Sequence, residues 1–445
     1  MNKLKLMKFG GSVLNSKDNF QKMKDILIET ENPYIIVVSA FSKVTRQLDD
    51  AARFAELGEI SEAESIVKNL YHFHLDLSKS IIHNELQISE VEYILNKAFT
   101  RIRELIKGVF ITQELTPRIQ DLILSFGEWF ALNITYYFLI ENNIQIEKID
   151  ATEIIITDSN YGNAHPNIET TSKNIENIIL PLVTNHNSII IQGFVAKSLD
   201  GEITTMGIES SNLTATIIAD LLSINEVIFW TDVEGIRSAD PKIALHSTPI
   251  SRMSYSEAYL ASINGLKLIY PQMIDFAKQK NIKIIYHSAI NPKGDFTEIN
   301  NFDANCNCTI LVIKENISLL KLNFNSSNNK IKLHNHLDNL IDYYSSSFII
   351  ISNPENFLIA VESSMLKNIT LPKHFISSIK SDVTIITILN LKPELLSLIF
   401  DEIIKYKNKS ENIFILSYQF GAIFRIIIEK KYSKDFYRTL SKIIV

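Results

Sequence analysis

A lysine followed by two glycines stands just after an apolar run near the start of the chain, as Lys8-Phe9-Gly10-Gly11-Ser12 after Leu4–Met7. Glycines let backbone N–H groups approach an anion closely, and the lysine adds a mobile positive charge. The same residues also suit an ordinary turn. The choice between a phosphate-binding segment and a turn therefore depends on whether later segments of the chain fit the same chemistry, and several of them do.

Five later segments place hydroxyl, carboxyl or lysine side chains at the ends of apolar runs. They are Val37–Thr45, Thr116–Glu128, Thr204–Ala215, Trp230–Ile236 with Ala239–Lys242, and Gly265–Pro271. Ligands of open α/β sheets bind at the carboxyl ends of strands and at helix N-termini. In the second segment, Glu128 could hold the ammonium group of an amino-acid substrate, or it is a surface carboxylate. Each segment has a plain loop or cap interpretation by itself, and their order along the chain gives them meaning together.

The elements that must position these residues alternate between strands and helices up to about residue 300. Continuous Ile- and Val-rich runs predict parallel strands at Leu4–Phe9, Tyr34–Ser39, Ser188–Phe194, Glu226–Asp232 and Ile282–His287. Longer periodic stretches predict helices at Ser61–Ser80, Ser89–Lys107, Asp121–Glu141, Asn212–Leu222 and Ser254–Asn264. Several of these begin with Ser, Asp or Asn, the preferred N-cap residues. The pattern is typical of an α/β domain.

From about Asn300 the chain becomes rich in Asn, Ser, Ile and Lys, and its strands alternate. It predicts two small βαββαβ-like units in tandem. The first has strands near Ile317–Phe324, Ser347–Ser352 and Phe357–Glu362, with a helix near His334–Asp342; the second has strands Asp382–Leu389, Ile413–Tyr418 and Ala422–Glu429, with helices Pro393–Lys405 and Ser433–Ile443. We therefore predict three domains, at residues 1–300, 301–380 and 381–445.

Composition restricts the class of protein further. The 445 residues are 46% hydrophobic and 21% charged, with a net charge of -6 and no basic cluster, which favours neither nucleic acid nor an anionic membrane as partner. The two cysteines, Cys306 and Cys308, cannot build a disulfide framework or a zinc site. We find no secretory pattern and no apolar run long enough to span a bilayer, so we expect a soluble cytoplasmic protein. His72 and His74 point to different faces of a predicted helix, so they favour core or surface positions over a metal site.

Taken in order, these motifs resemble those of the aspartokinases, in the amino acid kinase superfamily. The resemblance rests on KFGGS, VVSAFSKVT, TPRIQDLILSFGE, DATEIIITDSNYG, IIIQGF, WTDVEGI with ADPK, and SYSEAYLASINGLKLIYP, and it covers nearly the whole chain. It implies a three-layer αβα sandwich with a mostly parallel open sheet, followed by ferredoxin-like α+β ACT repeats. It also implies transfer of the ATP γ-phosphoryl group to the β-carboxylate of L-aspartate, the entry to lysine, threonine and methionine synthesis. Mg²⁺ is expected to be carried by the nucleotide.

The resemblance also implies roles for individual residues. Lys8 matches the lysine that neutralises the transferring phosphoryl group, and Gly10 and Gly11 match its phosphate cradle. Ser39, Thr45 and Glu128 match the aspartate site, with Glu128 facing the substrate ammonium. The other positions around the nucleotide are Phe9, Gly207, Ser211, Thr231, Asp232, Lys242 and Lys267.

One loop departs from the family pattern G-R-G-G-S-D, because this chain has Gly207-Ile208-Glu209-Ser210-Ser211-Asn212. The family arginine grips the aspartate carboxylate, and losing such a contact is expected to cost about 2–5 kcal/mol of binding. Glu209 adds a negative charge where a glycine would face phosphates, and Asn212 replaces a carboxylate. Smaller departures occur at Trp129, Ala131, Arg237, Lys242 and Tyr270.

Three alternatives remain open from these departures. The chain is an aspartokinase with a rearranged carboxylate clamp, a kinase for another acid, or a catalytically weakened homologue that still binds nucleotide, an amino acid or partners. The segments Asn325–Asn329 and Ser345–Ile349 also lack the family's effector-site features, which predicts weak or absent feedback inhibition. The ACT units are expected to form a homodimer interface.

Overall fold

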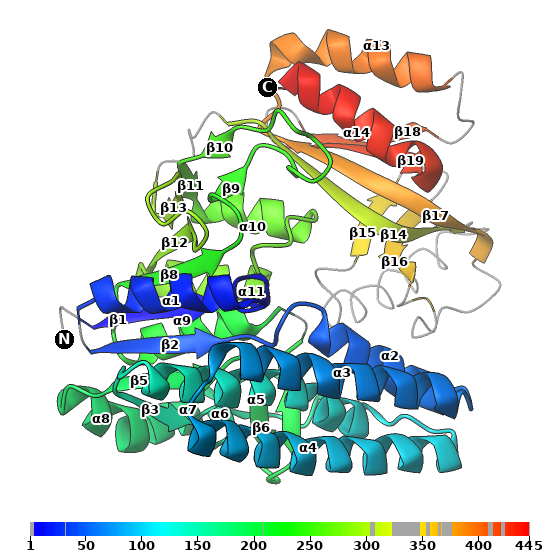
Figure 1. Cartoon of the computed structure of the whole chain (residues 1–445). Coiled ribbons are helices and arrows are strands. Elements are labelled where there is room, and N and C mark those ends of the chain that lie inside the picture. The colour runs from blue at the N-terminus through cyan, green and yellow to red at the C-terminus, as the bar shows by residue number, and fades with distance from the viewer. Residues whose placement is uncertain are drawn as a thin grey trace. The chain divides into compact units, whose positions relative to one another are not determined.

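The computed structural model describes residues 4–31, 33–207, 209–302, 308–322, 348–352, 357–363, 366, 376–407, 413–419 and 423–444. The chain forms two compact units, Met1–Gly235 with Gln272–Asn301, and Ile236–Pro271 with Phe302–Val445. The segment Ile236–Pro271 therefore interrupts the first unit along the sequence and folds as part of the second (Figure 1). The three domains expected at residues 1–300, 301–380 and 381–445 stay a prediction.

A mostly parallel sheet organises the first unit. Its strands lie in the order β13-β12-β8-β1-β2-β5-β3, with bounds Thr297–Asn300, Lys283–Ser288, Glu226–Thr231, Lys5–Phe9, Tyr34–Val38, Ser188–Gln192 and Ile146–Ile149. The pairs from β12 to β3 are parallel, and β13 is antiparallel to β12. Phe9 lies opposite both Val38 and Trp230, so β2, β1 and β8 end at one level.

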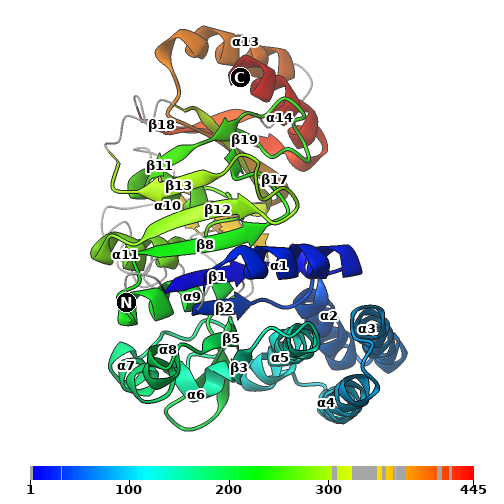
Figure 2. The ribbon, with the colours of Figure 1, turned by 60° about the vertical axis from the view of Figure 1, so that its left-hand side comes forward.

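Helices cover this sheet because its apolar side chains point to both faces. Met7, Phe9, Ile36 and Val38 share one core with the helices α1 to α5, whose bounds are Lys17–Glu29, Val44–Glu56, Ile60–Ile81, Glu85–Thr112 and Pro117–Glu141. Helices α2 to α5 pack together as a bundle (Figure 2). The helix α9 (Ser211–Leu221) contacts β1, β2 and β8. The predicted α/β class with a mostly parallel sheet is confirmed.

Shorter elements complete the first unit. They are the 3-10 turn Gly11–Val13, α6 (Ala151–Ile154), α7 (Ile168–Asn174), the π-helical turn Ile175–Ile179, α8 (Leu180–Thr184), α11 (Pro271–Lys280) and a small sheet of β4 (Ile156–Thr157), β6 (Val195–Ser198) and β7 (Ile203–Thr205). The strand β7 leads directly into the loop that precedes α9.

An antiparallel sheet organises the second unit. Its order is β15-β16-β14-β17-β19-β18, with bounds Phe348–Ser352, Phe357–Glu362, Ile310–Leu322, Ile376–Leu389, Ile423–Glu429 and Phe414–Gln419. Because β14 pairs with β17, the strands predicted for two separate units join into one sheet. The helices α13 (Leu396–Lys407) and α14 (Lys430–Ile444) pack against each other, and α14 contacts β14, β17 and β19.

The inserted segment of the second unit carries β9 (Ile236–Arg237), β10 (Pro249–Ile250), β11 (Arg252–Ser254) and α10 (Tyr255–Ile263). Strands β9 and β10 pair with each other. Helix α10 begins with a capping box in which the Ser254 hydroxyl and the Glu257 carboxylate satisfy each other's backbone N–H groups.

Most predicted elements agree with the structure to within a few residues, and the exceptions have physical reasons. The helix predicted at Ser89–Lys107 begins at Glu85, because the Asn84 side chain accepts hydrogen bonds from Leu86 and Gln87 N–H. His74 is buried and His72 is exposed, so the two side chains lie on different faces of the helix, as predicted. The helix predicted at His334–Asp342 lies outside the described residues.

The expectation that no apolar run could span a bilayer is wrong for one helix. Helix α5, at Pro117–Glu141, is long and apolar enough to cross a membrane by length and composition alone. However, 67% of its most apolar window is buried inside the structure. The apolar side chains of α5 belong to the same core as β1 and β2. A core helix buried all round has the composition of a membrane span, so the sequence criterion does not separate the two.

Candidate active site

The strand ends of the first unit bring the earliest predicted residues together. The Gly10 N–H donates to the Trp230 carbonyl at 3.2 Å, which ties the end of β1 to the end of β8. On the other side, the Ser39 N–H donates to the Phe9 carbonyl at 3.3 Å. The carboxyl ends of β8, β1 and β2 therefore lie next to one another, joined by backbone hydrogen bonds. Ligands of open α/β sheets bind at such strand ends.

Gly11 allows the backbones after β1 and β2 to touch. A Cβ atom there would lie 2.0 Å from the Ala40 carbonyl oxygen, so no other residue fits without movement of the backbone. The Ser42 N–H donates to the Gly11 carbonyl at 3.2 Å. The Ser12 hydroxyl donates to the Asp232 carboxylate at 3.0 Å. The lysine-glycine segment and the Thr-Asp segment are thus held side by side.

The N-terminus of α9 is pressed against the same edge. A Cβ atom on Gly193, just after β5, would lie 2.6 Å from the Ser211 Cα atom. The Ser211 and Ser39 hydroxyls lie 3.2 Å apart. Ser210, the N-cap residue, is completely buried, and its hydroxyl has no hydrogen-bond partner among the described residues. The N-terminus of an eleven-residue helix therefore lies against the strand ends.

Glu128 on α5 supplies a buried carboxylate. Its side chain is 3% exposed and is hydrogen-bonded to the Ala40 backbone. Its Oε2 atom has no hydrogen-bond partner in the part of the chain that the structure describes. The neighbouring Gly127 brings α5 close to α2, since a Cβ atom there would lie 3.5 Å from the Thr45 hydroxyl. Thr45 and Glu128 thus belong to one small region.

Burial shifts the pKa values of the two principal ionisable groups of the site, Lys8 and Glu128, in opposite directions. It lowers the pKa of Lys8 to about 8, against the opposing attraction of Glu209 and Glu128. It raises the pKa of Glu128 to about 8, against its backbone hydrogen bonds and the attraction of Lys8. A lysine and a carboxyl group whose pKa values are moved this far are typical of a functional site.

The remaining predicted residues divide between the two units. Thr231 ends β8, and Gly207 has a φ of 91°, a left-handed conformation that suits glycine. Lys242 and Lys267 belong to the second unit and are both exposed. Ile208, the residue in place of the family arginine, lies outside the described residues.

Asp121 is an anchoring residue to which the sequence analysis gave no role. Its carboxylate accepts hydrogen bonds from the Gly162 N–H at 2.9 Å and from the Thr205 N–H and hydroxyl at 2.8 and 2.7 Å. Thr205 stands two residues before Gly207, so Asp121 fixes the start of the loop that leads to α9. The sequence contains a signal for this role, because Asp121 and Glu128 lie seven residues apart and share one face of a mostly apolar helix.

Arg237, one of the departures from the family pattern, has a local structural role. Its guanidinium donates to the Ser247 hydroxyl at 2.9 Å and to the Ser247 carbonyl. These contacts link β9 to the chain just before β10. Trp129, another departure, packs against the core of the first unit.

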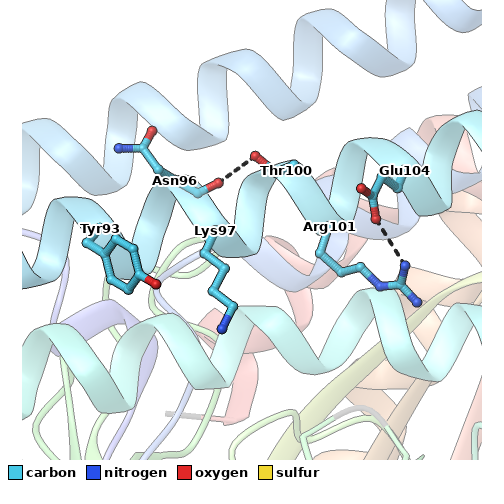
Figure 3. A pocket seen from close by; sticks show the side chains of 6 residues that line it. All are labelled: Tyr93, Asn96, Lys97, Thr100, Arg101 and Glu104. Carbon is cyan, nitrogen blue, oxygen red and sulfur yellow. Dashed lines mark hydrogen bonds and ion pairs between the residues drawn. The ribbon is translucent and has the colours of Figure 1, made fainter.

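The hollow along the outer side of α4 is not part of this site. Figure 3 shows its six lining residues, Tyr93, Asn96, Lys97, Thr100, Arg101 and Glu104, which all come from that helix. Their spacing places them on one face of the helix. The Thr100 hydroxyl donates to the Asn96 carbonyl, and Arg101 pairs with Glu104. This is the solvated face of a surface helix, and none of the predicted site residues lines it.

The first unit therefore combines a lysine, a glycine cradle, a helix N-terminus and a buried carboxylate at one sheet edge. These groups can hold phosphate and a cationic group side by side. The described residues contain no cluster of three His, Cys, Asp or Glu side chains suited to a metal ion.

Comparison with known proteins agrees with this class of site. The model of the amino acid kinase family matches residues 3–285, and the chain belongs to that family. Among curated proteins, Aspartokinase 1, chloroplastic, of Arabidopsis thaliana is 28% identical over 331 residues, which cover 71% of this chain and 56% of that protein. Lysine-sensitive aspartokinase 3 of Escherichia coli (strain K12) is 25% identical over 331 residues, covering 72% and 70%.

A solved structure gives the same fold. The E. coli aspartokinase III complex with aspartate and ADP (R-state) superposes with a TM-score of 0.84 at 19% identity, covering 99% of both chains. The aligned region spans 56%, 36% and 57% of the first three curated relatives, so the chain spans about half the length of those proteins. The predicted family resemblance is confirmed.

Proposed function

We propose that the protein is an aspartate kinase, which transfers the γ-phosphoryl group of ATP to the β-carboxylate of L-aspartate and forms 4-phospho-L-aspartate. In this reaction a carboxylate oxygen of aspartate forms a bond to the γ-phosphorus, the bond from that phosphorus to the β,γ-bridging oxygen breaks, and ADP leaves. Phosphoryl transfer needs positioned reactants and neutralised charge more than a covalent group on the protein.

The observation that carries the proposal is a buried carboxyl group with a half-buried lysine near it at the strand ends. Glu128 is 3% exposed with one oxygen unpartnered among the described residues. A buried carboxylate needs a cation, and the ammonium group of an amino acid supplies one. Lys8 lies close enough to interact with it electrostatically. We assign Lys8 to the transferring phosphoryl group and Glu128, with Ser39 and Thr45, to the amino acid.

The other assignments extend from that pair. Phe9, Gly10, Gly11, Gly207, Ser211, Thr231, Asp232, Lys242 and Lys267 would contact the nucleotide, and Mg²⁺ would be held by its phosphates. The protein would act in the cytoplasm as a homodimer formed through its C-terminal ACT-like units. The E. coli aspartokinase III structures, with aspartate and ADP in one and lysine and aspartate in the other, support small-molecule ligands of these kinds.

The raised pKa of Glu128 predicts how the acceptor binds. With a pKa of about 8, this carboxyl group is mostly protonated at neutral pH, and it must ionise to pair with an ammonium group. The KM for the amino acid should therefore fall as the pH rises toward 8, by up to about tenfold per pH unit. A KM that does not change between about pH 6 and 8 would contradict the role given to Glu128.

The acceptor is tested by comparing L-aspartate with succinate, which has both carboxylates and lacks the ammonium group. ATP turnover is measured as ADP release. We expect turnover with L-aspartate and at least about tenfold lower kcat/KM with succinate, because Glu128 would be left without its cation. Equal values for the two acids would refute the assignment of Glu128.

A second candidate function is a weakened homologue that still binds nucleotide or an amino acid. Ile208 and Asn212 favour it, and so does Glu209, whose negative charge acts on Lys8. The double variant Ile208→Arg with Asn212→Asp separates the two functions. A large gain in aspartate-dependent turnover would indicate an impaired native site, and no gain would indicate that other residues hold the carboxylate.

A further inference from the structure

The segment Ile236–Pro271 lies within the family match but folds with the C-terminal residues. Ala239 and Ala244 of this segment are buried in the same apolar core as Leu311, Phe424 and Phe436. The backbone is paired as well, since the Leu311 N–H donates to the Ser238 carbonyl at 2.7 Å. The loop around Lys242 is therefore part of the core of the second unit.

One side chain of the C-terminal helix α14 connects these parts. Tyr437 is completely buried. Its hydroxyl accepts a hydrogen bond from the Asp240 N–H at 2.8 Å and donates one to the Leu311 carbonyl at 2.8 Å. A single hydroxyl thus satisfies two backbone groups, a part-buried one in the loop and a buried one in β14. Replacing it with hydrogen would leave both backbone groups without this partner.

The hydroxyl fixes the loop immediately beside Lys242. The Lys242 N–H donates to the Asp240 carboxylate at 2.8 Å, which forms a tight turn. The next residue is also held, because the Arg438 guanidinium donates to the Ile243 carbonyl at 3.2 Å. Lys242 itself is exposed. Helix α14 therefore holds the backbone on both sides of the exposed Lys242, at Asp240 and at Ile243.

We propose that Tyr437 is a positioning residue for Lys242, so that the C-terminal helix sets how tightly the enzyme holds its nucleotide. The inference rests on the proposed function, in which Lys242 contacts the nucleotide. Tyr437 does not touch the nucleotide and acts through the backbone at Asp240. Its hydroxyl prearranges the loop, which lowers the ordering cost that nucleotide binding would otherwise carry.

The test compares Tyr437→Phe with Tyr406→Phe. Tyr406 is a buried tyrosine of the same core, and its hydroxyl donates to Asp435 on α14 at 2.5 Å and not to the loop. We expect both variants to lower the melting temperature. Only Tyr437→Phe should speed amide hydrogen exchange at residues 238–244 and raise the KM for ATP about threefold to tenfold, with kcat little changed.

Coupling to Lys242 separates positioning from general damage. In a Lys242→Met background, Tyr437→Phe should raise the KM for ATP no further, because the charge that it positions is already gone. Additive effects, or equal effects of Tyr437→Phe and Tyr406→Phe on that KM, would overturn the inference. An unchanged KM for ATP in Lys242→Met alone would also overturn the inference. The proposed reaction is tested independently, by measuring acyl phosphate formation. If turnover is absent, the Kd for ATP from calorimetric titration takes the place of KM.

Discussion

Glu128→Gln should stabilise the protein at alkaline pH while it weakens the use of the amino acid. Burial raises the pKa of Glu128 from 4.5 to about 8, so the folded protein binds more protons than the unfolded chain between these values. Stability must then fall as the pH rises through that window. At about 1.36 kcal/mol per pKa unit, the loss between about pH 5.5 and 8 is about 3 kcal/mol.

Glutamine keeps the shape of the side chain and removes this titration. The free energy of unfolding of Glu128→Gln, from urea denaturation, should therefore depend less on pH over that window, by about 3 kcal/mol. Lys8 acts on stability mainly between its lowered pKa of about 8 and 10.5. The variant also removes the attraction of Glu128 that raises this pKa, so the two curves are compared most directly below about pH 7. The exposed Glu64 on α3 supplies the control as Glu64→Gln, whose curve should follow that of the unaltered protein.

Glu128→Gln should also bind L-aspartate more weakly. A charge-assisted hydrogen bond contributes about 1.5–3 kcal/mol, so the KM for L-aspartate should rise roughly tenfold to a hundredfold. Parallel stability curves for Glu128→Gln and the unaltered protein would refute the raised pKa. An unchanged KM would refute the contact between Glu128 and the substrate.

Two further perturbations test the packing that builds the site. Gly11→Ala places a Cβ atom 2.0 Å from the Ala40 carbonyl oxygen, so it should lower both the melting temperature and kcat. In Gly108→Ala, inside α4, the added Cβ atom would meet no atom outside the local helix backbone within 4 Å, so this variant should instead stabilise by about 1 kcal/mol. Burial lowers the pKa of His74 to about 4 from 6.5, so stability should fall by about 3 kcal/mol as the pH drops from 6.5 to 4. His74→Phe should remove that acid dependence in urea denaturation, and a persisting dependence would contradict it.

The strands and their ends could be predicted because their signals are local. The apolar runs before Gly10, Ser39 and Asp232 each correspond to a buried parallel strand, and parallel strands must bring their carboxyl ends to one edge. Glu128 was singled out from a motif. Its burial, which produces the pKa shift, depends on α2 and β2 packing around it and could not be predicted from the motif alone.

The roles of Asp121 and Tyr437 depend on contacts between distant segments. Asp121 bonds to Thr205 across 84 positions, and Tyr437 bonds to Asp240 across 197 positions. The placement of the segment after Gly235 depends on such contacts as well, because this segment has the local pattern of a kinase loop and folds with the C-terminal core. Local periodicity carries no information about such partners.

Trapping the reaction product tests the central claim most directly. The full chain is incubated with ATP, Mg²⁺, L-aspartate and hydroxylamine, which converts an acyl phosphate into a hydroxamate that mass spectrometry identifies. We expect the β-hydroxamate of aspartate, formed only with ATP and lost in Lys8→Met. A protein that binds ATP yet gives no hydroxamate, or gives the α-hydroxamate, would contradict it.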